Sequence, residues 1–199
     1  MIPITLRTPR LILRPWRASD ADSFAAMFDD PAVMEFLPPA PDRAAVDAII
    51  GRIEAHFTQH GFGWWAAEAP GAAPFIGFIG LAHLGFDAPF TPAVEIGWRL
   101  ARPYWSQGYA TEGARAALEA GFTQLGFSEI VSLTVPANAR SRRVMERIGM
   151  TRDPADDFDH PRLAAGDPLR RHVLYRIDRA RWETRLGAAV EQPAKPRKP

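Results

Sequence analysis

The segment from Trp98 to Thr111 constrains the fold of this chain more than any other part of the sequence. An apolar run, Val94 to Leu100, ends in a Pro-aromatic turn, and the short Ser106-Gln107-Gly108 loop then opens directly into a helical pattern. A glycine loop of this kind lets consecutive backbone N–H groups point into one space at the positive end of a helix. The segment therefore predicts a strand, a tight loop and a helix arranged around an anion site sized for a phosphate or pyrophosphate.

The loop differs from the dinucleotide-binding fingerprint. The sequence contains no G-x-G-x-x-G, and no acidic residue follows a second strand at the expected distance. A short loop with one glycine also forms in ordinary α/β proteins. A nucleotide-binding domain and a plain turn are therefore alternatives at this point.

Composition narrows the class of protein. A chain of 199 residues is long enough for one compact domain with a sizeable core. The formal net charge of +1 provides no field that would attract nucleic acid or an anionic membrane. The absence of cysteine excludes disulfides, thiolate metal sites and a cysteine nucleophile. The chain shows neither a signal pattern nor an apolar run of membrane-spanning length, so we expect a cytoplasmic protein with no membrane partner.

Alternating strand and helix patterns predict an α/β protein. Ser19 is expected to cap the first helix, with Asp22 at the capping-box offset. We expect residues 1–190 to form one domain and residues 191–199 to be a disordered, Pro-rich basic tail. The expected strands are 10–14, 62–68, 75–84, 93–101, 130–135, 150–158 and 171–177, and the expected helices are 19–30, 46–60, 109–125, 138–148 and 179–190.

Several segments, in their order and spacing, carry a resemblance to a known family. They are Tyr104 to Glu112, Asn138 to Met150, Glu95 to Trp98, and the opening Pro9 to Trp16 with Asp20 and Asp30-Pro31. Together they resemble the GCN5-related N-acetyltransferase (GNAT) superfamily, and within it the RimJ/RimL-like ribosomal-protein N-terminal acetyltransferases. The resemblance covers roughly residues 8–177.

The resemblance implies a fold and a set of coenzyme contacts. The fold is a single-domain acyl-CoA N-acyltransferase, whose mixed, mostly antiparallel sheet is splayed between its fourth and fifth strands and flanked by helices. Acetyl-CoA is the implied acetyl donor, and no metal is implied. Loop amides would bind the pyrophosphate, and backbone groups near Trp98 to Leu100 would bond the acetyl carbonyl and pantetheine. The expected coenzyme contacts are Trp98, Leu100, Arg102, Gln107, Gly108, Tyr109, Ala110, Thr111, Asn138, Ser141 and Arg143, with Arg140 as a further candidate for the phosphates.

Two positions depart from the family pattern. Trp105 stands where the pattern has Gln or Arg, which suggests that backbone amides do the binding. Met145 stands where many members have a tyrosine general acid, so Ser141 becomes the candidate to protonate the leaving thiolate. A coenzyme thiolate is also a good leaving group near neutral pH and can leave without an acid. Asn138 is both a helix N-cap and, by the resemblance, a pantetheine contact.

Glu95 is the candidate general base. An amine acceptor is protonated at pH 7, since lysine-type and α-amino pKa values are about 10.4 and about 8, and a carboxylate within an apolar strand is costly unless it is paired or solvated. The alternative is that Glu95 forms a salt bridge with Arg99 or another arginine. His83 on the neighbouring strand is the reserve base.

The expected reaction is transfer of acetyl to a primary amine by direct attack in a ternary complex. The acceptor is a protein N-terminus or a small-molecule amine, with rims at residues 35–41 and 87–92. The acidic segment 156–161 would attract a cationic amine, bind a divalent metal or simply be a solvated loop. The alternative function is a non-catalytic acyl-CoA sensor or assembly module. Homodimerisation is left open, and no nucleic-acid partner is expected.

Overall fold

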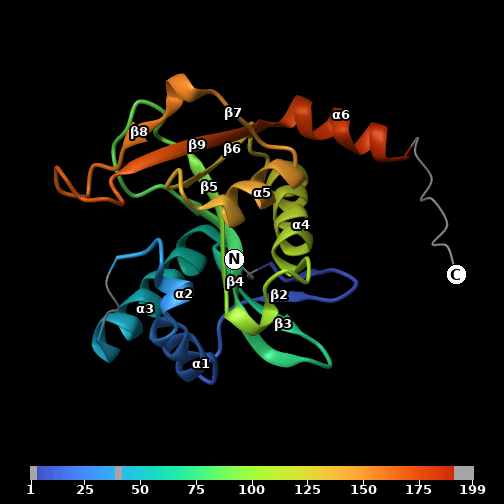
Figure 1. Cartoon of the computed structure of the whole chain (residues 1–199). Helices are drawn as coiled ribbons and strands as arrows, with labels where there is room; N and C mark the ends of the chain where they lie inside the picture. The colour runs from blue at the N-terminus through green and yellow to red at the C-terminus, as the bar shows by residue number, and fades with distance from the viewer. Residues whose placement is uncertain (1–3, 39–41, 191–199) are drawn as a thin grey trace, which may run out of the picture.

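A computed structural model of the chain describes residues 4–38 and 42–190, and it places helices on both sides of a twisted central sheet (Figure 1). The strands are β1 (Leu6–Arg7), β2 (Ile12–Arg14), β3 (Trp64–Ala69), β4 (Ala73–His83), β5 (Val94–Leu100), β6 (Glu129–Thr134), β7 (Thr151–Arg152), β8 (Phe158–Asp159) and β9 (Arg171–Asp178). The helices are α1 (Asp20–Ala26), α2 (Pro31–Met34), α3 (Arg43–His60), α4 (Tyr109–Thr123), α5 (Ala139–Arg147) and α6 (Arg179–Val190), and the 3-10 turns are η1 (Met27–Asp29), η2 (Arg102–Tyr104) and η3 (Pro154–Asp156).

The sheet is mixed and mostly antiparallel. Its strand order is β1-β2-β3-β4-β5-β6-β9-β7, and β8 pairs with β9 beside this path. The pairing of β5 with β6 is parallel, whereas the other pairings in the described residues are antiparallel. This architecture confirms the fold class that the sequence predicts.

The central strands β5 and β6 diverge. Their register consists of Glu95 opposite Val131, although β5 continues to Leu100. On its other side, β5 pairs continuously with β4 from Val94 to Leu100. The expected splay is therefore present, and it falls between β5 and β6 because the unpredicted two-residue strand β1 precedes the others.

Strand register assigns side chains to the two faces of the sheet. The pairs Ala82–Glu95, Gly80–Gly97 and Phe78–Arg99 share one face, which we call the Glu95 face. The alternate residues of β5, including Leu100, lie on the opposite face, which we call the Leu100 face. Helix α1 packs on the Glu95 face, where the rings of Phe24 and Phe78 are 6.0 Å apart.

Helix α4 covers the Leu100 face at close range. A Cβ built on Gly113 would lie 2.4 Å from Cδ1 of Ile79, a residue of β4 that faces Trp98. Only glycine allows the helix backbone to approach the sheet this closely. The approach brings the N-terminus of α4 next to the end of β5, where the candidate anion site lies.

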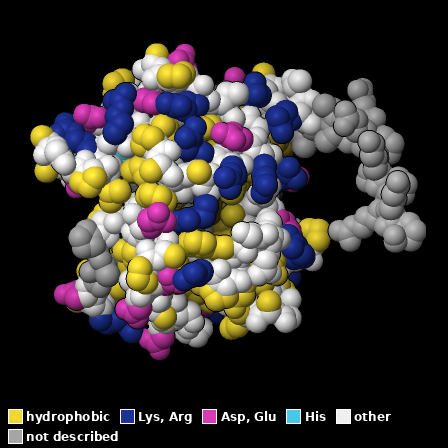
Figure 2. All heavy atoms as spheres, in the orientation of Figure 1, with side chains coloured by type: hydrophobic (Ala, Val, Ile, Leu, Met, Phe, Trp, Pro, Cys, Tyr) yellow, Lys and Arg dark blue, Asp and Glu magenta, His cyan; other side chains and the backbone are white. Residues whose placement is uncertain are grey.

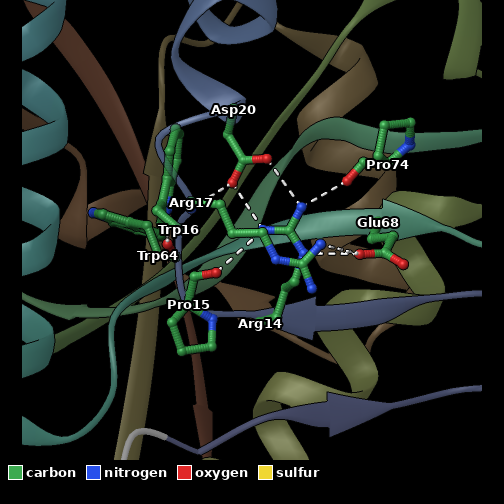
Figure 3. A network of polar contacts seen from close by, with 8 residues as sticks. All are labelled: Arg14, Pro15, Trp16, Arg17, Asp20, Trp64, Glu68 and Pro74. Carbon is green, nitrogen blue, oxygen red and sulfur yellow. Dashed lines mark hydrogen bonds and ion pairs between the residues drawn. The ribbon is translucent and has the colours of Figure 1, made fainter.

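A buried ion pair fixes α1 against the strands (Figure 3). The Arg14 guanidinium donates to Asp20 at 2.8 and 2.9 Å and to Glu68 of β3 at 2.8 Å. Asp20 also accepts a hydrogen bond from the Arg17 backbone amide. This arrangement replaces the predicted Ser19 cap, since the Ser19 side chain makes no cap hydrogen bond.

Two of the sequence predictions concern the C-terminal third of the chain. The predicted strand 150–158 is wrong, because β7 ends at Arg152 and η3 and the short β8 follow. Pro154 lacks the N–H that a strand ladder requires, and Asp153 caps η3 by accepting from Ala155 N. The predicted tail 191–199 lies outside the described residues. Within the described part, no helix has the length and apolar character needed to cross a membrane.

Candidate active site

The loop between β5 and α4 presents a run of free backbone amides. Gly108 is the N-cap of α4 with φ +84°, Ser106 has φ 60°, and no side chain caps the helix. The amides of residues 106–111 donate to no acceptor among the described residues. The positive end of the α4 dipole lies at the same place. The predicted set from Gln107 to Thr111 is thus gathered in a geometry suited to a phosphate group.

Arg10 supports this loop from the N-terminal segment. Its Nη1 donates to the Gln107 carbonyl at 2.9 Å, its Nε donates to Glu112 at 2.6 Å, and its guanidinium carbon lies 4.6 Å from the Tyr109 ring centroid. Partial burial acts to raise the pKa of Glu112, but hydrogen bonds from Thr8 and Arg10 hold it below its usual value. The contacts of Arg10 with Glu112 and the loop are not predicted from the sequence, because Arg10 and Glu112 are far apart in the chain and no local pattern links them.

The diverging strand offers a second set of backbone groups. Ala101 N donates to Ile76 O and Leu84 N donates to Ala93 O, so the odd-numbered residues around β5 direct their backbone groups towards β4. The groups of Trp98 and Leu100 therefore point to the side from which β6 has diverged. The Leu100 carbonyl accepts from Trp105 Nε1 at 2.7 Å. Trp105 thus has a structural role at a position where the family pattern has a polar residue.

Asn138 acts as the N-cap of α5. Its Oδ1 accepts from Ser141 N at 3.1 Å, and its Nδ2 donates to Thr134 Oγ1 at 3.0 Å. The capping role is therefore present in the structure. Ser141 is half-buried on the first turn of the helix, and its hydroxyl has no hydrogen-bond partner among the described residues.

Arginines occur in η2, which follows β5, and on α5, which follows β6. Figure 2 shows basic side chains gathered over the region of α4 and α5. Arg102 of η2 and Arg143 of α5 are both exposed. Arg140 instead pairs with Glu35, at the C-terminal end of α2, at 2.5 Å and lies 4.8 Å from the Trp105 ring centroid. Arg140 therefore links α5 to the predicted rim at residues 35–41.

Glu95 lies on the Glu95 face at the point where β5 and β6 separate. It is half-buried, and burial raises the pKa of its carboxyl to about 8. It has no ion-pair or hydrogen-bond partner among residues 4–38 and 42–190, so the salt bridge with Arg99 that was weighed as an alternative does not form. A carboxylate that is desolvated and unpaired in this way is typical of functional sites.

The Trp64 ring lies next to Glu95. A Cβ on Gly97 would stand 2.9 Å from Cη2 of Trp64 and 3.9 Å from Oε1 of Glu95. Gly97 therefore makes room for the indole, which extends from β3 across the sheet. His83, the reserve base, pairs with Val94 and projects on the opposite face from Glu95. The structure thus separates the two candidates for the base.

The acidic segment after β7 is largely neutralised by arginines. Asp157 pairs with Arg152, and Asp156 pairs with Arg176 at 2.8 Å. Asp159 pairs with two further arginines. Within the described residues, no group of three or more His, Asp or Glu side chains is arranged to hold a metal ion. The ring of Phe158 in the same segment lies 4.8 Å from Phe90 of the predicted rim at residues 87–92.

A mixed sheet that opens between two parallel strands, beside a loop of free amides at a helix N-terminus, defines an acyl-CoA-dependent acyltransferase. Comparison with known proteins gives the family: residues 10–151 match the acetyltransferase (GNAT) domain. The chain belongs to the GNAT acetyltransferase family, whose fold binds acetyl-CoA.

Three similar proteins illustrate the match. FsC-acetyl coenzyme A-N(2)-transacetylase from Aspergillus fumigatus is 30% identical over 189 residues, which span 89% of this chain and 77% of that protein. An acetyltransferase structure from Agrobacterium tumefaciens has a TM-score of 0.71 and 28% identity, and the match covers 90% of this chain and 96% of the other. Mycobacterium smegmatis RimJ in complex with CoA-disulfide has a TM-score of 0.71, 22% identity and coverage of 96% and 98%. The likeness to RimJ is one of fold.

Proposed function

We propose that this acetyltransferase transfers the acetyl group of acetyl-CoA to a primary amine that binds on the Glu95 face. The observation that carries the proposal is the unpaired, half-buried carboxylate of Glu95 at the point where β5 and β6 separate. The name of the Aspergillus relative describes acetyl transfer from acetyl coenzyme A to a nitrogen, N(2). This supports a nitrogen acceptor for the present chain.

The free amides of residues 106–111 would hold the coenzyme pyrophosphate without help from side chains. The backbone groups of Trp98 and Leu100 would bond the pantetheine arm and the acetyl carbonyl in the opening between β5 and β6. The exposed Arg102 and Arg143 would pair with coenzyme phosphates. Asn138, which caps α5, would contact the pantetheine arm.

Acetyl-CoA supplies the acetyl group as a thioester. The amine nitrogen bonds to the acetyl carbon as the carbon–sulfur bond breaks, and Glu95 accepts the proton that the nitrogen loses. With a pKa of about 8, the ionised Glu95 carboxylate is a much stronger base than an ordinary glutamate. The departing thiolate takes its proton from Ser141 or from water. Direct transfer fits a chain without cysteine, which has no thiol to carry the acetyl group.

The proposed acceptor class includes protein amines and small-molecule amines. Structures of similar fold include ribosomal-protein acetyltransferases, one described as a putative ribosomal-protein-serine acetyltransferase from Vibrio cholerae. We therefore propose a protein N-terminal amine or a small-molecule amine as the acceptor. An amine panel assayed by release of free CoA thiol would identify it.

Glu95→Gln tests the base. The amide has the same shape but cannot accept the proton, so kcat should fall by about 10²–10⁴-fold while the affinity for CoA is retained. Glu119→Gln, an exposed change on α4, is the matched control and should behave as wild type. Full turnover in Glu95→Gln would remove Glu95 as the base. CoA binding without thiol release for any amine would instead support the alternative of a non-catalytic acyl-CoA sensor.

A further inference from the structure

Arg99 is a desolvated cation without a counter-ion. Among the described residues, each of the other buried or half-buried arginines donates a hydrogen bond to, or forms an ion pair with, a carboxylate, a carbonyl or a hydroxyl; these are Arg14, Arg142, Arg152, Arg170, Arg176 and Arg179. Arg99 is half-buried and has no such partner in the part of the chain that the structure describes. A charge is rarely left in this state, because burial without pairing costs free energy.

Two aromatic rings hold the Arg99 side chain. Its guanidinium carbon lies 5.3 Å from the ring centroid of Phe28 in η1 and 5.5 Å from that of Phe78 in β4. Burial lowers the pKa of Arg99 to about 10, which still leaves the side chain charged at neutral pH. The ring faces attract the cation but offer no hydrogen-bond acceptor. The guanidinium N–H groups therefore remain available to an anion.

Arg99 and Glu95 share one face of the same strand. They are four residues apart, so their Cα atoms are separated by about 13 Å. Gly97 lies between them and carries no side chain, and the Glu95 carboxylate extends towards it. The Glu95 carboxyl and the Arg99 guanidinium are thus arranged to contact opposite ends of one molecule lying along β5.

We propose that Arg99 binds an anionic group of the acceptor, so that the acceptor is an amine that also carries a carboxylate several atoms away. The proposal rests on the proposed function, because it places the reacting amine at Glu95. The chemistry is complementary: Glu95 receives the proton of the amine, and Arg99 donates a pair of hydrogen bonds to the carboxylate. Arg99 would then determine which amines are accepted.

The spacing sets the length of the acceptor. Glu95 extends towards Gly97, so the amine and the anion would lie between about 6 and about 13 Å apart, given the rise of a strand. A free α-amino acid is too short, because its amine and carboxylate share one carbon. A linear ω-amino acid or a short peptide, at about 3.5 Å per residue, reaches this separation.

Acetyl transfer to matched pairs of compounds tests the proposal. The acceptors are glycine, β-alanine, γ-aminobutyrate and ε-aminocaproate, each compared with its carboxamide, which differs only in lacking the charge. For the wild type, kcat/KM should favour the acid over the amide by about 10–100-fold for ε-aminocaproate and by little for glycine. The effect should appear mainly in KM.

Variants of Arg99 assign the selectivity to this side chain. In Arg99→Gln the acid-to-amide ratio should fall to about one, and Arg99→Lys should retain part of it, because a lysine keeps the charge but loses the paired geometry. Arg52→Gln, an exposed arginine on α3, is the matched control and should keep the wild-type ratio. An equal ratio in wild type and Arg99→Gln would overturn the proposal.

A binding measurement separates this proposal from the reaction. Thermal unfolding in the presence of CoA is followed with N-acetyl-ε-aminocaproate and with its carboxamide. The acid should raise Tm more than the amide in wild type, and this difference should be absent in Arg99→Gln. Equal shifts in wild type would overturn the role of Arg99 even if acetyl transfer is observed. If no acetyl transfer is observed but the acid still raises Tm more than the amide, only the proposed function is contradicted, and the role of Arg99 in binding stands.

Discussion

The Trp64 indole lies over Gly97, with Cη2 only 2.9 Å from where a Cβ would stand. Two glycines, Gly80 and Gly97, are paired across β4 and β5: the backbone at Gly63 and Trp64 lies where a Cβ of Gly80 would stand, and the Trp64 ring lies where a Cβ of Gly97 would stand. The Trp64 ring therefore packs next to Glu95, and its position depends on the lack of a side chain at Gly97.

Gly97→Ala should displace this ring. The added methyl is closer to Trp64 than real Cβ atoms come to their neighbours, so the indole must move towards the acceptor site. We expect an increase in KM for the amine with unchanged affinity for CoA, measured by steady-state kinetics and calorimetry. Gly51→Ala is the control, because its Cβ meets nothing within 4 Å and helix propensity makes it neutral or slightly stabilising. Wild-type kinetics in Gly97→Ala would contradict the role assigned to the ring.

Glu95→Gln should change how stability depends on pH. The folded carboxyl has a pKa of about 8, against about 4.5 in the unfolded chain, so the folded state holds its proton over that interval and ionises only above it. The contribution of Glu95 to the wild-type free energy of unfolding should therefore decline as pH rises from 5 to 9. The variant, which stays neutral, should become the more stable protein at pH 9 by roughly a few kcal/mol.

Thermal unfolding at several pH values provides the measurement. The histidines with lowered pKa values titrate alike in both proteins, so their contribution cancels in the difference. Parallel curves for wild type and Glu95→Gln between pH 5 and 9 would show that Glu95 is not desolvated.

Asp20→Ala should be strongly destabilising. It leaves the buried Arg14 guanidinium with one of its two carboxylate partners and frees the Arg17 amide. The expected loss is about 3–5 kcal/mol in urea unfolding. Asp22→Ala is the control, because Asp22 pairs with Arg43 in an exposed position and such pairs contribute about 0–1 kcal/mol. Similar losses for both variants would refute the importance of the buried pair.

Gly108→Ala should weaken CoA binding. A side chain is strained at φ +84°, so the loop must rearrange and the amides at the start of α4 lose their common direction. Gly126→Ala is a close control, because Gly126 has a similar φ of +76° and an added Cβ would meet nothing within 4 Å. Gly126 also lies beyond the C-terminal end of α4, away from the loop. Both variants should lose about 1 kcal/mol of stability. Only Gly108→Ala should lose CoA affinity in isothermal titration, and equal affinities would rule out the loop as the phosphate site.

The sequence predicts the parts of this fold that depend on local signals. The α3 helix ends at Gly61 in a left-handed cap, α4 begins after Gly108, and β5 spans the expected apolar run. The region around β7 and β8 was wrongly predicted as one strand, because its short extended pieces are held by pairing with β9 and not by their own pattern.

The residues of the candidate site also differ in how far the sequence predicts them. Residues within a continuous motif, such as the loop at Gly108, were found from the sequence, whereas Arg10 was not, because its contacts come from distant segments. Arg99 appeared in the sequence analysis only as a partner for Glu95. That interpretation is wrong because residues four apart on a strand share a face but are too far apart to pair.

The amide loop has a consequence for how this protein can change over generations. The atoms that we propose to bind the coenzyme belong to the main chain, so side-chain substitutions at the exposed Gln107 can accumulate with little penalty, provided that the backbone keeps its path, whereas the φ of 60° at Ser106 restricts the residues allowed there. Heritable variation in coenzyme affinity should then arise from replacements to or from glycine and proline in the loop and from changes at Arg10, which holds the loop. Acceptor preference can change independently, through residues on the Glu95 face.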